Sequence, residues 1–390
     1  MAIPRWALYP ILIPSALYSL LVILATFPPV QRELLYMHHA RQFWLDANDP
    51  VSHGFAPGQV TPFYIPTPDG QKLHAWHVLS PTDYAKHEEV LRREPTGLLE
   101  EPWLSEGFRI VRDGAVRDKR NVIVFFHGNA AALDQGVRTK TYRHLLAAAL
   151  PNTSLLAFDY RGFGLSSGTP SEAGLIADGL SVLEYVLDEF AVSPARILIV
   201  GHSLGTAVAA AAVQAWDDRD IREGGSEIVG AGENSFAGMI LVAGFSDLAT
   251  LLQTYWIAGV IPTLGALRHI PGMHDLLVGF LVDTWRTTDR LAEVLRRGKG
   301  FPVHLEILAA KNDWDINYTH SNMLFDAAAA AANSTVSNGQ DLEILAAEDG
   351  NIFIRKEIVE AGGHDGTLLG SAVQIAVMRV FDKARFVEKG

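Results

Sequence analysis

The sequence predicts an α/β protein: a mostly parallel sheet flanked by helices, with a helical lid insertion and an N-terminal transmembrane helix. Short, continuous apolar runs recur within residues 119–390, and helical stretches alternate with them. Such runs are typical of strands buried on both faces, and strands that alternate with helices form parallel βαβ units. The uncharged segment Trp6–Val30 is the observation that predicts the membrane helix.

The segment Trp6–Val30 is long enough to cross a bilayer, whose hydrocarbon core needs about 20 apolar residues in a helix. A cleaved signal peptide is one alternative, although no small-x-small cleavage site follows, and a buried or interfacial helix is another. The side of the membrane that the rest of the chain faces stays open, because the flanking charges differ too little. The sequons at Asn152, Asn317 and Asn333 only hint at lumenal exposure and leave glycosylation open.

We expect three parts in the chain: an N-terminal anchor at 1–30, an extension at 31–118 and an α/β domain at 119–390. The extension begins with a helix and a Pro/Gly-rich connector. A hairpin follows, in which Val60–Ile65 and Leu73–Leu79 flank the turn Thr67–Gly70. Residues 81–118 are charged and contain several prolines, so we interpret them as a surface excursion.

In the α/β domain, strands are predicted at 121–126, 154–158, 196–200, 238–243, 303–309 and 352–359. Helices are predicted at 137–149, 204–216 and 371–386, and one more helix ends near 190. A capping box at Thr169–Glu172 begins that helix. Two segments interrupt the alternation. Residues 245–300 are helical and unusually apolar, as in a lid, and residues 326–350 are interpreted as a surface insertion.

The composition excludes several classes of protein. Hydrophobic residues make up 48% of the 390 residues and charged residues 19%, which excludes a disordered chain. The lack of Cys excludes disulfides, thiolate metal sites and a Cys nucleophile. A net charge of −12 argues against nucleic-acid binding, which needs a basic surface. The histidines show no metal-ligand spacing such as His-x-x-x-His on a helix, so we expect no metal site. His38 and His39 are adjacent and are not expected to share a face.

Two pentapeptides match the pattern G-x-S-x-G: Gly201–Gly205 around Ser203, and Gly164–Gly168 around Ser166. A nucleophilic serine of this pattern lies on a sharp turn between a buried strand and a helix. Ser203 has an apolar strand directly before it and an Ala-rich helix directly after it. Ser166 lies several residues beyond its strand and is assigned to a loop. We therefore predict Ser203 as the nucleophile.

A serine hydroxyl needs a general base, and the base needs an acid that orients it. In this kind of fold the acid follows a later strand and the histidine follows the last one. His364 lies in Gly362–Gly366 after the last predicted strand, and Asp313 follows the strand before it. We predict His364 as the base and Asp313 as the acid, with Asp315 and Asp247 as alternatives for the acid.

The oxyanion hole needs two backbone N–H donors. One is expected from Leu204, which follows the nucleophile, and the other from the loop after the strand 121–126. Asn129 is the predicted second donor, with Ala130 as its alternative. His127 precedes Ser203 in the chain and is expected to brace this loop by hydrogen bonding.

Four motifs carry a resemblance to a known family: Phe126–Ala131, Phe158–Glu172, Gly201–Gly205 and Gly363–Gly366. In these motifs the chain resembles the membrane-anchored α/β-hydrolase domain-containing proteins. That branch includes monoacylglycerol and lysophosphatidylserine lipases and the fungal bud-emergence-type hydrolases. The resemblance covers about residues 120–390.

The resemblance implies the α/β-hydrolase fold, a triad of Ser203, Asp313 and His364, and an endoplasmic-reticulum-type membrane. The chain departs from the family at the acid loop. In such proteins the Asp is often followed by two apolar residues and Pro, whereas Trp314, Asp315 and Ile316 follow Asp313 here.

The function predicted from these residues is hydrolysis of acyl esters by a serine hydrolase that requires no cofactor or metal. The anchor and the apolar segment 245–300 favour a lipid-like ester, such as a monoacylglycerol or a lysophospholipid. A thioesterase or peptidase is an alternative, because the same triad serves all acyl transfers. A non-catalytic membrane scaffold is a second alternative. The exact substrate and the oligomeric state stay open.

Overall fold

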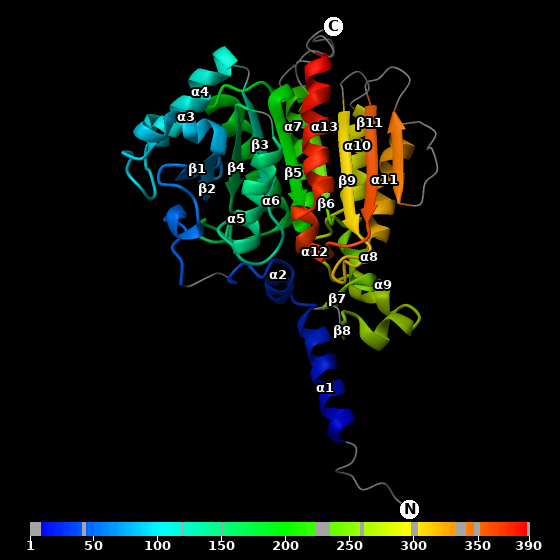
Figure 1. Cartoon of the computed structure of the whole chain (residues 1–390). Coiled ribbons are helices and arrows are strands. Elements are labelled where there is room, and N and C mark those ends of the chain that lie inside the picture. The colour runs from blue at the N-terminus through cyan, green and yellow to red at the C-terminus, as the bar shows by residue number, and fades with distance from the viewer. Residues whose placement is uncertain are drawn as a thin grey trace, which may run out of the picture.

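The computed structural model describes residues 9–40, 44–118, 120–149, 151–222, 235–257, 261–297, 303–332, 341–346 and 352–387 (Figure 1). A nine-stranded sheet has the order β1-β2-β4-β3-β5-β6-β9-β11-β10. Its strands are β1 (Val60–Pro66), β2 (Lys72–Leu79), β3 (Asn121–Phe126), β4 (Thr153–Phe158), β5 (Ile197–His202), β6 (Gly238–Val242), β9 (Val303–Ala310), β10 (Leu342–Ala346) and β11 (Ile352–Val359).

The strand pairs from β4 across to β11 are parallel. Antiparallel pairing is confined to the two ends of the sheet, where β1, β2 and β10 lie. The fold class predicted from the alternating runs is therefore confirmed. The predicted strands at 121–126 and 352–359 coincide with β3 and β11.

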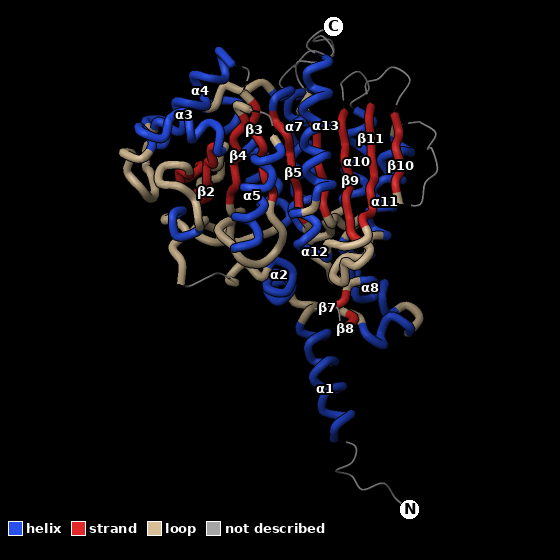
Figure 2. Tube along the Cα trace, in the orientation of Figure 1, coloured by secondary structure: helices blue, strands red, loops and turns tan. Residues whose placement is uncertain are grey.

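The helices are α1 (Tyr9–Leu24), α2 (Pro28–Tyr36), α3 (Pro81–Leu91), α4 (Glu106–Asp118), α5 (Gly136–Ala148), α6 (Glu172–Glu189), α7 (Leu204–Arg222), α8 (Leu248–Thr254), α9 (Met273–Val278), α10 (Thr287–Arg297), α11 (Thr319–Ala331), α12 (Gly363–Gly366) and α13 (Ser371–Val387). Six of these helices form layers on the two faces of the sheet (Figure 2). The helices α5 and α13 pack on one face, and α6, α7, α10 and α11 pack on the other.

Side chains of β3 show why this strand is uniformly apolar. Val122, Val124 and Phe126 point into the core beneath α6 and α7, whereas Ile123 and Phe125 point into the core beneath α5 and α13. Successive side chains of a strand point to opposite faces, so burial on both faces requires an unbroken apolar run.

The predicted hairpin is part of the sheet. Its second strand, β2, pairs with β4, so the sheet crosses the boundary expected at residue 119. Residues 81–118 are also more than a surface excursion, because they form α3 and α4, and Leu91, Phe108 and Val111 are buried in the core. Because charged residues are frequent in this stretch, its sequence does not reveal the apolar face that packs on the core.

The prediction of a surface insertion at 326–350 is wrong in two places. The Ala-rich tract belongs to α11, where Ala328, Ala329 and Ala331 are buried. Residues Leu342–Ala346 form β10, which pairs with β11 at the edge of the sheet. Residues 333–340 and 347–351, including the sequon at Asn333, lie outside the described residues.

The cap of α6 also differs from the prediction. Ser171, and not Thr169, is the N-cap, and its hydroxyl accepts a hydrogen bond from the Gly174 N–H at 3.1 Å. Glu172 does not fold back onto Thr169. Its carboxylate instead accepts hydrogen bonds from the backbone N–H groups of Thr284 and Trp285.

The apolar segment after β6 leaves the sheet at its carboxyl edge and carries α8, a short ribbon of β7 (Trp256–Ile257) and β8 (Ile261–Pro262), and α9 (Figure 1). This excursion, which we call the lid, ends near Trp285 and not at residue 300, because α10 packs against α7 and α11. Its exposed apolar side chains are Trp256, Ile270, Leu276, Phe280 and Val282.

The helix α1 projects from the molecule beside the lid (Figure 1). The Tyr18 hydroxyl donates a hydrogen bond to the Thr263 carbonyl at 3.0 Å, and most other large side chains of α1 are exposed. Within the described part of the chain, no single helix has the length and hydropathy of a membrane span. Leu12–Leu24 and Pro28–Tyr36 reach that hydropathy only when taken together, and they meet at a bend of 105°.

Candidate active site

The turn between β5 and α7 holds Ser203 in a backbone conformation that serine rarely adopts. Its φ of 52° lies in the left-handed region, which costs about 1–3 kcal/mol for a non-glycine residue. The Ser203 N–H donates to the Val242 carbonyl on the neighbouring strand at 3.0 Å. Strand and helix converge so closely here that a Cβ on Gly205 would lie 2.0 Å from the Phe126 oxygen. Only a sharp turn with small flanking residues fits this position.

His364 and Asp313 meet at the same edge of the sheet. The Nδ1 atom of His364, in α12, lies 2.9 Å from Oδ2 of Asp313, in the loop after β9. The carbonyl of His364 lies 3.2 Å from Nε2 of His202, and the two imidazole rings are 4.9 Å apart. Since His202 directly precedes Ser203, the three predicted triad residues gather around the end of β5.

The carboxylate of Asp313 is fixed by the backbone of its own loop. Its Oδ1 atom accepts hydrogen bonds from the N–H groups of Asp315 and Ile316, both at 2.9 Å, which leaves Oδ2 for the imidazole. Asn312 ties this loop to the histidine loop, because its side-chain oxygen accepts the N–H groups of Gly362 and Gly363 at 3.0 and 2.9 Å. Sequence reasoning missed Asn312.

The charges around His364 favour its protonated form. Burial lowers the pKa of His364, but the hydrogen bond and charge of Asp313, with the charges of Asp315 and Asp365, outweigh burial and raise it above 6.5. Burial and the neighbouring His364 hold the pKa of His202 well below that value. An imidazolium is therefore stabilised at position 364 and not at 202.

The two alternative acids occupy different roles. Asp315 lies near His364, but its N–H donates to Asp313, and burial raises the pKa of its carboxyl. Asp247 is the N-cap of α8 and accepts a hydrogen bond from the Thr250 N–H at 2.7 Å. Of the three candidate acids, Asp313 is the one that is hydrogen-bonded to the His364 ring.

The loop after β3, residues 128–132, lies against the nucleophile turn. A Cβ on Gly128 would be 3.1 Å from the Ser203 Cβ. Arg138 on α5, which is buried, donates to the carbonyls of Gly128, Asn129, Ala130 and Ala132 at 2.7–3.1 Å. We call residues 128–132 the oxyanion loop. Nothing in the pattern of α5 distinguishes Arg138 from a surface arginine.

His127 braces this loop, as the sequence predicts. Its Nδ1 atom lies 2.7 Å from the Gly128 carbonyl, and its Nε2 atom lies 3.3 Å from Oδ1 of Asp159. Burial raises the pKa of Asp159, but hydrogen bonds and charge from His127 and His74 outweigh burial and lower it to about 2. His127 therefore serves the loop and not the serine.

Ser166, in the second G-x-S-x-G pattern, is a loop residue. Its hydroxyl donates to the Asp159 carbonyl at 2.7 Å and accepts the His74 N–H at 2.8 Å. Both bonds fix the turn between β4 and α6 to β2, in keeping with the sequence analysis.

Among the described residues, two groups of side chains have the geometry to approach a metal ion. One is Asp313, Asp315 and His364, which belongs to the site just described. The other is Glu33 in α2 with His38 and His39 just after it, where the two imidazole rings lie 4.0 Å apart. The expectation that these two histidines share no face is therefore wrong, because a left-handed turn at Met37 folds the chain back.

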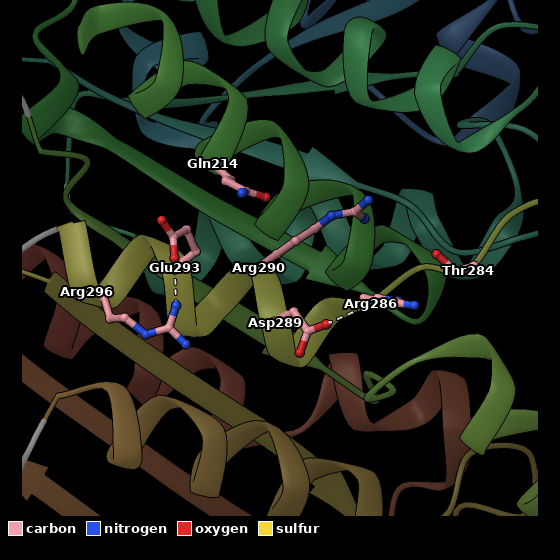
Figure 3. Close-up of a pocket in the computed structure, with 7 residues that line it drawn as sticks. All are labelled: Gln214, Thr284, Arg286, Asp289, Arg290, Glu293 and Arg296. Carbon is pink, nitrogen blue, oxygen red and sulfur yellow. Dashed lines mark hydrogen bonds and ion pairs between the residues drawn. The ribbon is translucent and has the colours of Figure 1, made fainter.

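A pocket of about 480 Å³ lies between α7 and α10, and none of the predicted triad residues lines it (Figure 3). It is lined by Gln214, Thr284, Arg286, Asp289, Arg290, Glu293 and Arg296. Each arginine faces a carboxylate: Arg286 faces Asp289, Arg290 faces Glu172 and Arg296 faces Glu293. This internal pairing leaves little charge to attract a ligand, and we place the candidate site at Ser203.

Comparisons with known proteins find relatives that match about half of this chain. ABHD12 of Danio rerio, a lysophosphatidylserine lipase, is 27% identical over 199 residues, which are 51% of this chain and 46% of that protein. Protein ABHD12B of Homo sapiens is 31% identical over 172 residues, which are 43% of this chain and 40% of that protein. The chain thus spans less than half the length of these curated relatives.

An alpha-beta hydrolase from Vibrio vulnificus has the same fold, with a TM-score of 0.55 at 15% identity over 92% of this chain and 91% of that chain. The alpha/beta hydrolase family matches residues 123–367, which extend from β3 to the residues just after α12. This match contains Ser203, Asp313 and His364. The chain therefore belongs to the alpha/beta hydrolase family.

Proposed function

We propose that the chain is a serine hydrolase of acyl esters and that Ser203, His364 and Asp313 are its catalytic triad. The observation that carries the proposal is the strained turn at Ser203 beside a His364–Asp313 hydrogen bond. A serine at such a turn presents its hydroxyl above the sheet and at the N-terminus of a helix. An aspartate on Nδ1 holds the imidazole with its Nε2 lone pair available for a proton.

In the proposed reaction the Ser203 oxygen attacks the ester carbonyl while His364 takes the hydroxyl proton. The backbone N–H groups of Leu204 and Asn129 donate to the oxyanion that forms. Leu204 is the first residue of α7, and the first N–H groups of a helix lack intrahelical partners. His364 then gives its proton to the leaving alkoxide, and an acyl-enzyme remains. Water, deprotonated by His364, cleaves that ester and restores Ser203.

The substrate class that we propose is a lipid-like ester, such as a monoacylglycerol or a lysophospholipid. One line of support is the apolar lid at the edge of the sheet, where Leu276, Phe280 and Val282 are exposed. The other is that curated relatives of the chain are named lysophosphatidylserine lipases. The large exposed apolar surface of a lid is typical of contact with lipid or membrane. A thioesterase or peptidase would use the same triad.

We also propose that α1 attaches the protein to a membrane. The support is its exposed apolar side chains, among them Leu17, Leu20 and Ile23, and the long uncharged segment to which it belongs. The endoplasmic-reticulum membrane implied by the resemblance is the proposed location. Carbonate extraction of membranes tests the attachment, and protease protection tests which side the catalytic domain faces.

Labelling by a fluorophosphonate and a panel of esters test the function together. The full chain in detergent micelles is compared with Ser203→Ala and with Ser166→Ala, the serine of the second pentapeptide. We expect labelling in wild type and Ser166→Ala and none in Ser203→Ala. Of a lysophospholipid, a monoacylglycerol and a short-chain soluble ester, the two lipids should turn over fastest. A wild type that neither labels nor hydrolyses any ester would favour the scaffold alternative, and turnover of the soluble ester alone would refute the lipid class.

A further inference from the structure

The C-terminal end of α2 is hydrogen-bonded to the oxyanion loop. The Tyr36 carbonyl accepts the Ala130 N–H at 2.8 Å, and the Leu35 carbonyl accepts the side-chain amide of Asn129 at 3.3 Å. The last carbonyls of a helix have no intrahelical partner. The helix ends at Met37, whose φ is 46°. The oxyanion loop therefore satisfies two carbonyls that α2 leaves free.

The oxyanion loop needs such support because its backbone is strained. Ala130 and Ala131 have φ values of 57° and 55°, in the left-handed region that alanine disfavours. A left-handed backbone conformation at a non-glycine residue persists only where the surrounding structure fixes it. Arg138 fixes the carbonyl side of the loop, and Tyr36 fixes the N–H of Ala130. Because the Ala130 N–H is bonded to Tyr36, this contact favours Asn129 over Ala130 as the loop's donor to an oxyanion.

The side chain of Tyr36 joins this end of α2 to the lid. Tyr36 is fully buried, its hydroxyl donates to Oδ2 of Asp283 at 2.7 Å, and it accepts from Nε1 of Trp285 at 3.3 Å. Oδ1 of Asp283 accepts the Glu172 N–H at 3.0 Å. The last residues of the lid are thus bonded both to α2 and to the beginning of α6.

A second contact between α2 and the lid is made by Gln31, about one and a half helical turns before Tyr36. The side-chain amide of Gln31 donates to the Phe280 carbonyl at 2.7 Å, and its oxygen accepts the Val282 N–H at 3.1 Å. The Gln31 amide and the Tyr36 hydroxyl both bond to the same short stretch of the lid. A displacement of that stretch therefore moves α2 as one body.

We propose that Tyr36 is a positioning residue for the oxyanion hole, and that α2 is the element through which the lid and the oxyanion loop are coupled. The inference rests on the proposed function, since the oxyanion hole has a role only in acyl transfer. Tyr36 touches neither the nucleophile nor the base, so its effect passes through Ala130. The helix α2, which follows α1 in the chain, then positions the oxyanion loop and does more than connect α1 to the α/β domain.

The test uses the full chain with Tyr36→Phe, which keeps the ring and removes the bonds to Asp283 and Trp285. Tyr84→Phe is the matched control, because Tyr84 is a buried tyrosine on α3 whose hydroxyl donates to the Pro57 carbonyl at 3.0 Å. Turnover of p-nitrophenyl butyrate is normalised to the sites that a fluorophosphonate titrates. We expect kcat to fall about tenfold in Tyr36→Phe, with KM unchanged, because small misplacements of a catalytic donor act on the transition state. Tyr84→Phe should keep the wild-type kcat.

Hydrogen exchange of the peptide that contains residues 128–132 gives a readout that does not depend on activity. We expect it to exchange faster in Tyr36→Phe than in wild type and Tyr84→Phe. Asp283→Ala should reproduce both effects, and the double variant with Tyr36→Phe should lose no more kcat than either single variant. Unchanged exchange and a kcat equal to that of Tyr84→Phe would overturn the inference while the proposed function stands. A wild type without turnover would overturn the proposed function and the catalytic part of the inference. If hydrogen exchange of residues 128–132 were then also unchanged in Tyr36→Phe, the coupling between lid and oxyanion loop would be overturned as well.

Discussion

Replacing Asp313 by Asn tests how the acid loop selects the working tautomer of His364. In the structure, one oxygen of Asp313 accepts two backbone N–H groups at 2.9 Å, and the other oxygen faces His364 Nδ1 at 2.9 Å. An asparagine must turn its oxygen toward the two N–H donors, which places its NH₂ group against Nδ1. Nδ1 then becomes an acceptor, the ring proton moves to Nε2, and no lone pair remains for the Ser203 hydroxyl.

The expected loss in kcat for Asp313→Asn is about 10⁴-fold, the loss typical of a triad with the wrong tautomer. At 1.36 kcal/mol per factor of ten, this corresponds to about 5.4 kcal/mol of transition-state stabilisation. The assay is turnover of p-nitrophenyl butyrate, with the thermal midpoint measured alongside to show that the nearly isosteric variant folds. Asp247→Asn is the matched control, because Asp247 caps α8 and accepts the Ser246 hydroxyl, and His364 is bonded to Asp313 instead. A loss in Asp313→Asn of less than tenfold would refute the reasoning, and a loss of about 10⁴-fold in Asp315→Asn instead would assign the acid to Asp315.

Three further predictions follow from the same geometry. Asp315→Asn removes a negative charge that raises the pKa of His364. Because His364 acts as a base only when neutral, the acidic limb of kcat/KM against pH should move to lower pH. A limb that stays or moves to higher pH would contradict the assignment of His364 as the base. Gly128→Ala places a methyl group 3.1 Å from the Ser203 Cβ; we expect kcat to fall about 10- to 100-fold at an unchanged thermal midpoint, and wild-type kcat would show that the loop is free to move. Gly205→Ala would bring a Cβ to 2.0 Å from a backbone oxygen at the end of β3. Urea unfolding should show that the free energy of unfolding falls by about 4 kcal/mol or more. A decrease below about 1 kcal/mol would mean that helix and strand separate easily.

Much of the fold could be predicted because its signals are local. The run that forms β3 is apolar from Val122 to Phe126. The strand β5 leads directly into the G-x-S-x-G turn, so strand, turn and helix appear together in the sequence. The family match confirms the predicted α/β-hydrolase fold. The roles of Ser203, His364 and Asp313 stay predictions, although the structure brings the three residues to one place.

The features that the sequence did not predict depend on tertiary contacts. The strand β10 is short and lies at the edge of the sheet, and its pairing with β11 is visible only in three dimensions. Alanines 328, 329 and 331 contribute to the core through close packing and have too little apolar surface to form a clear pattern. Tyr36 bonds to the oxyanion loop from a remote part of the chain, and Arg138 bonds to it from the next helix. No spacing rule in the sequence connects either residue to the loop.

The most direct test of the account is to locate the covalent adduct that a fluorophosphonate forms with the full-length protein. Intact-mass measurement gives the number of adducts per chain, and tandem mass spectrometry of a proteolytic digest gives the modified residue. The account predicts a single adduct, on Ser203, whose formation is slowed by a saturating ester substrate and by Asp313→Asn. An adduct on another serine, or ester turnover that continues in Ser203→Ala, would contradict it.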